Sequence, residues 1–148
     1  MNRHKSLTFK LIFSAIVVVS LVAVRLFEKE WFPEVLQDFF ASDRYLSQPL
    51  PALHFSDYFS VIFRYAVNSV FSVVLLYIWF PDRPLIRLVI KIYVYAGLIL
   101  FALFIIAVHF YRPGHYTALF YIRRFLIQPL LLFVFLPLLY ALGGGRNA

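Results

Sequence analysis

Two short polar strings interrupt otherwise apolar stretches of this chain. The first places Arg64 and Asn68 four residues apart, and the second places Arg124 and Gln128 four residues apart, directly after Arg123. Residues four apart share one face of a helix, so each string presents a guanidinium beside a carboxamide. Arginine binds phosphate and carboxylate groups through a planar fork of donors. These residues therefore indicate the binding of an anion or of an anionic partner.

The chain has four long apolar stretches, and the two strings lie in the second and the fourth. Hydrophobic residues make up 63% of the 148 residues and charged residues only 14%, whereas soluble domains are about 25% charged. A helix of about 20 apolar residues crosses a hydrocarbon layer of about 30 Å. We therefore predict an all-α polytopic membrane protein that forms one integral membrane domain. The four expected spans are 6–27, 57–80, 86–110 and 117–142.

The loop expected at 28–56 is the one sizeable extramembrane segment. The stretch from Glu28 to Asp57 carries every acidic residue of the chain except Asp82. Four apolar residues in it recur at helical spacing: Val35, Leu36, Phe39 and Phe40. Together with Pro33, which suits a first helical turn, they predict a short amphipathic helix on the membrane surface. A plain acidic loop with aromatic anchors is the alternative.

Basic residues near the ends of the stretches decide the expected orientation. The net charge is +7, and the basic residues that cause it lie mainly at the ends of the expected helices. This placement indicates topology signals and contacts with anionic lipid headgroups, and it argues against nucleic-acid binding. The basic N-terminus predicts cytoplasmic termini. A cleavable signal peptide is the alternative for the first stretch. The residues from Arg25 to Glu28 lack a small-x-small cleavage site, so we expect an uncleaved span.

The arginines in the spans have no evident counter-ion at their own depth. An arginine near the bilayer centre costs about 2.5–3.5 kcal/mol, and the predicted spans offer no carboxylate deep enough to neutralise three of them. We therefore predict an anion- or partner-binding site made of five residues: Arg64, Asn68, Arg123, Arg124 and Gln128. In the alternative interpretation the arginines extend to headgroups, Arg64 pairs with Asp57, and the carboxamides hold helices together.

Other kinds of chemistry find little support in the sequence. The chain has no cysteine, which excludes disulfides, thiolate ligands and cysteine nucleophiles. The four histidines show no metal-ligand spacing, and Ser69 and Ser72 have no base beside them. Pro129 and Pro137 interrupt the fourth stretch, where we expect them to curve a span for packing; a kink that lines a cavity is the alternative. We expect no catalytic residue, no metal and no cofactor.

Several strings resemble the exosortase F system-associated membrane proteins. The specific one is Arg123-Arg124-Phe125-Leu126-Ile127-Gln128-Pro129, within 121–132, and similar strings occupy 64–69, 25–28 and 36–40. The region after Pro137 departs from the pattern. The resemblance implies an inner-membrane protein of Bacteroidetes type with an exosortase as its partner. Exosortases resemble cysteine transpeptidases, so a chain without cysteine is not itself that enzyme.

The sequence thus predicts a non-enzymatic accessory protein of an exosortase-type protein-sorting system at the inner membrane. It would bind a lipid phosphate or a substrate tail through its intramembrane arginines. A membrane enzyme or carrier acting on a polyprenyl-phosphate lipid is the alternative, and a purely structural helix bundle is a third hypothesis. The expected partners are an exosortase-family membrane protein and anionic lipid headgroups, without nucleic acid or metal.

Overall fold

The computed structural model describes residues 3–32, 34–42, 49–110 and 116–144, and every regular element in these ranges is a helix, as predicted. The elements are α1 (Arg3–Leu26), α2 (Glu28–Trp31), α3 (Val35–Ala41), α4 (Phe55–Trp79), α5 (Arg83–His109), α6 (Thr117–Ile127) and α7 (Leu130–Gly144). Three of them, α1, α4 and α5, are long and apolar enough to cross a membrane. The pair α6 and α7 makes a fourth candidate crossing.

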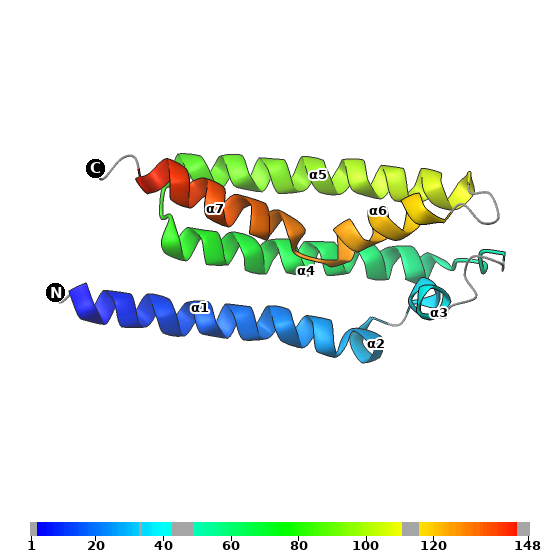
Figure 1. Ribbon diagram of the computed structural model, residues 1–148, viewed down its shortest axis with the longest axis horizontal. Coiled ribbons are helices and arrows are strands. Elements are labelled where there is room, and N and C mark those ends of the chain that lie inside the picture. The colour runs from blue at the N-terminus through cyan, green and yellow to red at the C-terminus, as the bar shows by residue number, and fades with distance from the viewer. Residues whose placement is uncertain (1–2, 33, 43–48, 111–115, 145–148) are drawn as a thin grey trace.

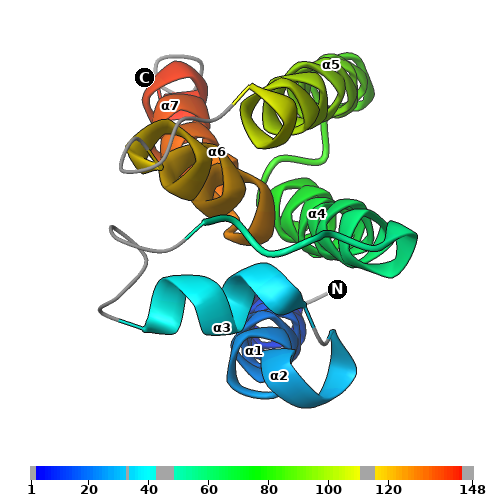
Figure 2. The ribbon, with the colours of Figure 1, turned by 90° about the vertical axis from the view of Figure 1, so that its right-hand side faces the viewer.

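Helix α4 is the centre of the bundle. It contacts α1 on one side and α5, α6 and α7 on the other (Figures 1 and 2). Val61 and Leu76 of α4 are fully buried in these contacts. The beginning of α1 and the end of α7 lie at the same end of the bundle (Figure 1). This placement is expected, because the chain runs along the bundle four times when α6 and α7 are taken as one pass.

The fourth apolar stretch is a broken helix. Helices α6 and α7 meet at a bend of 60°, where Gln128 has an extended backbone with φ −112° and ψ 143°. Pro129 causes the break, because it has no N–H to donate and its ring disfavours a helical conformation in the residue before it. Pro137, by contrast, lies inside α7 without ending it. A gently curved span at 117–142 is therefore not what the chain forms.

The segment between α1 and α4 folds back onto the end of the bundle. Helix α3 is seen end-on in Figure 1 and lengthwise in Figure 2, so it lies across the long helices. The predicted helix is present, but its apolar face packs against protein. Leu36 is fully buried, and the ring of Phe39 meets the ring of Tyr116, at the start of α6, edge to face with 5.4 Å between centroids.

Asp57, in the first turn of α4, holds this connection at two points. One carboxylate oxygen accepts the backbone N–H of Val35 at 3.1 Å, and the other accepts the N–H of His54 at 2.8 Å. The first bond holds the beginning of α3, and the second caps the N-terminus of α4, where unpaired N–H groups need acceptors. The carboxylate is buried, and each of its oxygens accepts one backbone N–H.

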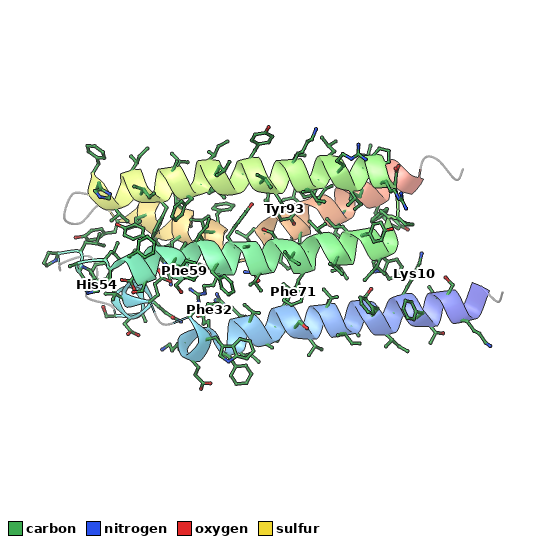
Figure 3. All side chains as sticks on the ribbon, turned by 180° about the vertical axis from the view of Figure 1, so that it is seen from behind. Lys10, Phe32, His54, Phe59, Phe71 and Tyr93 are labelled. Atoms are coloured by element: carbon green, nitrogen blue, oxygen red, sulfur yellow. The ribbon has the colours of Figure 1, made fainter. Side chains whose placement is uncertain are left out.

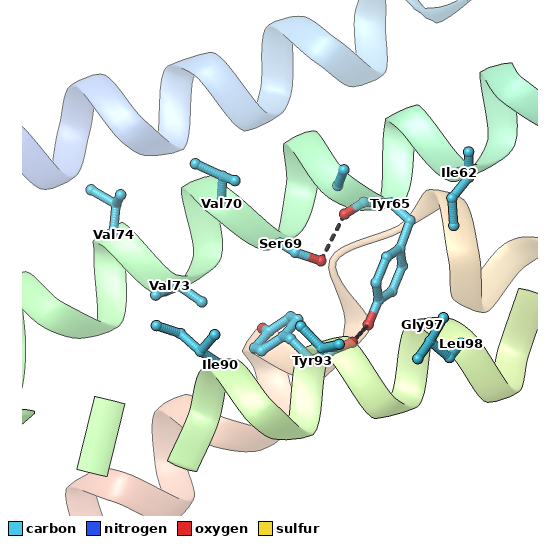
Figure 4. A pocket seen from close by; sticks show the side chains of 12 residues that line it. Ile62, Tyr65, Ser69, Val70, Val73, Val74, Ile90, Tyr93, Gly97 and Leu98 are labelled. Atoms are coloured by element: carbon cyan, nitrogen blue, oxygen red, sulfur yellow. Dashed lines mark hydrogen bonds between the residues drawn. The ribbon is translucent and has the colours of Figure 1, made fainter. Parts of the chain in front are cut away.

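Helices α4 and α5 approach each other closely at a single glycine. The Tyr65 hydroxyl donates to the backbone carbonyl of Tyr93 at 2.6 Å, which brings the Tyr65 ring over Gly97 (Figure 4). A Cβ atom at Gly97 would overlap Tyr65 Cε1 and lie 3.1 Å from Cδ1 and Cζ. The hydrogen bond prevents the ring from moving aside easily, so this position requires glycine.

We expect the substitution Gly97→Val to destabilise the bundle by about 1–3 kcal/mol, the usual cost of overfilling a packed site. Ala102→Val, at an exposed position of the same helix, should change the free energy of unfolding little. Unfolding in detergent micelles measures both variants. A Gly97→Val protein as stable as Ala102→Val would show that the Tyr65 contact does not restrict this position.

Candidate functional site

The centre of the site is a carboxylate that two arginines share. Glu34, at the N-terminus of α3, has a side chain with 0% exposure. Its Oε1 lies 2.8 Å from Nε of Arg123, and its Oε2 lies 3.0 Å from Nη2 of the same residue. That Oε2 also accepts from Nη1 of Arg64 at 3.0 Å. Three charge-assisted hydrogen bonds thus join α3 to α4 and α6, and the pair with Arg123 is bidentate.

A second carboxylate completes the network on the side of α2. Glu28 Oε2 accepts from Nη2 of Arg64 at 2.9 Å, and its Oε1 accepts from Nε2 of Gln37 at 2.8 Å. Arg25 approaches the same Oε2 only to 3.5 Å, with a side chain that is 54% exposed. The Arg64 guanidinium also lies over the ring of Phe32, with Cζ 5.6 Å from the centroid. The network thus balances the two buried guanidiniums with one buried carboxylate, Glu34, and one half-buried carboxylate, Glu28.

The aromatic ring of Phe32 covers the Arg64 guanidinium. Its ring packs against that of Phe63 on α4, with 5.7 Å between centroids, and Figure 3 shows it at the junction of α2 and α4. The exposure of Arg64 is only 1%. Because apolar rings cover the ion pairs, the charges interact in surroundings where water screens them little.

Two of the three arginines of the predicted site, Arg64 and Arg123, therefore have counter-ions within the chain. The expectation that Arg64 and Arg123 lack counter-ions is wrong, because the connection between α1 and α4 folds inward and supplies Glu34 and Glu28. The alternative pairing of Arg64 with Asp57 is also absent, since Asp57 accepts the two backbone N–H groups instead. An external anion would have to displace Glu34 to reach these two guanidiniums.

Asn68 binds the backbone at the break between α6 and α7. Its Nδ2 donates to the backbone carbonyl of Ile127 at 2.8 Å, and Ile127 is the last residue of α6. The carbonyls in the last turn of a helix have no partner within the helix, so this carboxamide satisfies one of them from the neighbouring helix. Asn68 therefore supports the bend between α6 and α7 and takes no part in the ion pairs around Glu34.

Arg124 and Gln128 form a separate, exposed pair. Arg124 Nε donates to Oε1 of Gln128 at 3.2 Å, whereas its neighbour Arg123 points into the ion network with only 6% exposure. Adjacent residues of a helix cannot face the same direction. The structure thus divides the five predicted residues into three settings. Arg64 and Arg123 share Glu34, Asn68 holds the end of α6, and Arg124 bonds Gln128.

Glu34, Glu28 and Gln37 are the site residues that sequence reasoning missed. All three precede or belong to the short amphipathic helix, which was expected to lie on the membrane surface, outside the bundle. One signal was available, because Glu34 follows Pro33 at the expected beginning of that helix. The acidic residues of the segment are the natural counter-ions for arginines that are costly to bury alone.

We expect Glu34→Gln to destabilise the protein strongly, by about 3–5 kcal/mol, because two guanidiniums would remain buried with too little negative charge. Glu30→Gln is the matched control, since Glu30 lies on α2 with an exposed side chain. Unfolding in detergent micelles compares the two variants. If Glu34→Gln unfolds like Glu30→Gln, the buried carboxylate does not hold the segment in place.

Asn68→Leu should cost about 1–3 kcal/mol, because it leaves the Ile127 carbonyl without its donor. Ser69→Ala, one residue along, removes only a bond of 2.7 Å to the Tyr65 carbonyl within the same helix, and we expect it to be nearly neutral. The same unfolding measurement distinguishes them. Equal effects of the two substitutions would contradict a special role for Asn68 at the break.

No protein-family model, no curated protein and no solved structure matches the chain. The similarity to the exosortase F system-associated proteins therefore stays a prediction that rests on the strings of residues quoted above.

Proposed function

We propose that this chain is a non-enzymatic accessory subunit of a protein-sorting machine, inserted in the bacterial inner membrane as a multi-pass protein. One observation carries this proposal. Each of the five polar residues of the predicted site bonds another group of the same chain. Polar residues that bond within the chain hold its helices in place. A subunit with a rigid surface suits binding to a partner protein. The resemblance supplies the class of partner, an exosortase.

The depth of the arginines in the membrane explains the need for Glu34 in this proposal. Trp79 suits one boundary of the hydrocarbon layer, as tryptophan prefers interfaces, and it ties α4 to α1 by donating to Ser14 Oγ at 2.9 Å. Arg64 lies fifteen residues earlier, or about 22 Å along the helix. In a layer of about 30 Å it would lie about 8 Å inside the other boundary. Charge at that depth must be paired.

The surface that we propose for the partner is the aromatic edge of α2. The rings of Phe27 and Trp31 stack with 5.5 Å between centroids, and their residues are 44% and 55% exposed. The network around Glu28 holds the turn of chain between them. Exposed aromatic side chains on a rigid support make strong anchors for partner proteins. With cytoplasmic termini, this edge faces the outer leaflet, where a sorting enzyme meets exported substrates.

The experiment is co-purification with a co-expressed exosortase in mild detergent. We expect wild-type protein to be retained and Trp31→Ala to be retained at least about fivefold less, because an aromatic anchor contributes more than 1 kcal/mol. Tyr95→Ala is the control, since Tyr95 is 64% exposed on α5. Unfolding of both variants should match the wild type.

Two results would contradict the accessory role. One is the absence of co-purification together with normal protein sorting after deletion of the chain, which would leave the structural helix bundle. The other is equal retention of Trp31→Ala and wild type, which would leave the aromatic edge as an anchor in lipid only.

A further inference from the structure

A cavity of about 420 Å³ lies between α1, α4 and α7, beside the helix break. Its volume is within the usual range for ligand sites, about 300–1,000 Å³. One end is polar, where Arg25, Glu28, Asn68 and Gln128 line it. The rest is apolar and extends along α1 to Val18 and along α7 to Leu136. The cavity therefore has the two-part character of a lipid, with a place for a headgroup and a place for a chain.

The charges at the polar end favour an anion. Glu28 is already engaged by Arg64 at 2.9 Å and by Gln37 at 2.8 Å. Arg25 reaches Glu28 only at 3.5 Å and keeps about half of its side chain exposed. Arg124 is exposed, and its hydrogen bond to Gln128 places a second cation next to the cavity lining. Among the described residues no carboxylate pairs with Arg124, so the polar end carries an excess of positive charge.

The apolar part has the direction that a lipid chain would take. From Arg25 to Val18 the cavity follows α1 for about 10 Å toward the end of the bundle where α1 begins. In the membrane arrangement proposed above, that direction leads from the outer interface toward the bilayer centre. The side chains of Val22, Leu132 and Leu136 line this part. An acyl chain would bury against them, while its phosphate remained beside Arg25 and Gln128.

We propose that this cavity binds one anionic glycerophospholipid of the outer leaflet, with its phosphate held by Arg25, Arg124 and Gln128 and one acyl chain between α1 and α7. The site differs from the one around Glu34, whose guanidiniums are used within the chain. It is also independent of the accessory role, because the lipid is bound by the isolated subunit. A bound lipid would complete the packing between α1 and α7.

Native mass spectrometry of the purified chain in detergent, titrated with phosphatidylglycerol, tests the proposal. We expect one phosphatidylglycerol per chain, with phosphatidylcholine bound at least about tenfold more weakly. Arg25→Gln with Arg124→Gln should weaken phosphatidylglycerol about tenfold or more, because each guanidinium gives charge-assisted hydrogen bonds. Arg87→Gln, an exposed cation in the first turns of α5, is the control and should leave binding unchanged.

A second pair of variants tests the place of the chain. Val22 lines the cavity and is 50% exposed, whereas Val19, on the same helix, is 66% exposed and lies outside the lining. Val22→Trp should fill the cavity and abolish the bound lipid without unfolding the protein. Val19→Trp should bind phosphatidylglycerol like the wild type.

Several results would overturn the proposal. Equal binding of phosphatidylglycerol and phosphatidylcholine would show that the site does not select a headgroup with net negative charge. Unchanged binding by Val22→Trp would remove the cavity as its location. Tighter binding of a polyprenyl phosphate than of phosphatidylglycerol would assign the cavity to a carrier lipid. A dimer that only Val22→Trp disrupts would assign it to a second copy of the chain.

Discussion

The structure depends on one buried carboxylate. Glu34 neutralises guanidiniums from two helices that are far apart in sequence, through contacts of 2.8 to 3.0 Å. Without it, Arg64 and Arg123 would each require water or a headgroup among apolar side chains, at a cost of several kcal/mol. With it, the connection between α1 and α4 becomes part of the core. The same bonds determine the position of α2 and α3 and the shape of the end of the bundle.

The broken helix and the ion network support each other. Pro129 makes α6 end at Ile127, which allows α6 to turn by 60° relative to α7. That turn lets Arg123 reach Glu34 on α3, while Asn68 satisfies the carbonyl at the end of α6. In a straight fourth helix, Arg123 would not lie at the same place relative to Glu34. The break also creates the polar end of the cavity beside α1, where Gln128 and Arg25 meet the same empty space.

Charge in this chain is therefore used in two ways. Arg64 and Arg123 are buried and paired, so they contribute to shape. Arg25 and Arg124 remain exposed at the margin of the network and are the cations available to a ligand. The distinction matters for function, because only some of the residues singled out in the sequence are accessible to an external anion. Arg64 and Arg123 are not, whereas Arg124 and Gln128, together with Arg25, form the proposed lipid site.

The sequence by itself determined the helical class and the approximate extent of the long helices, and it favoured the short amphipathic helix between the first two. These features depend on apolar length and on helical periodicity, which are local properties. It also identified the arginines as residues that need an anion. Only the tertiary structure decided that the anion is Glu34, that Asp57 binds backbone N–H groups, and that Arg123 and Arg124 face different surroundings. Those outcomes depend on how a connecting segment folds back and on the angle at Pro129, and neither is set by the spacing of residues within one helix.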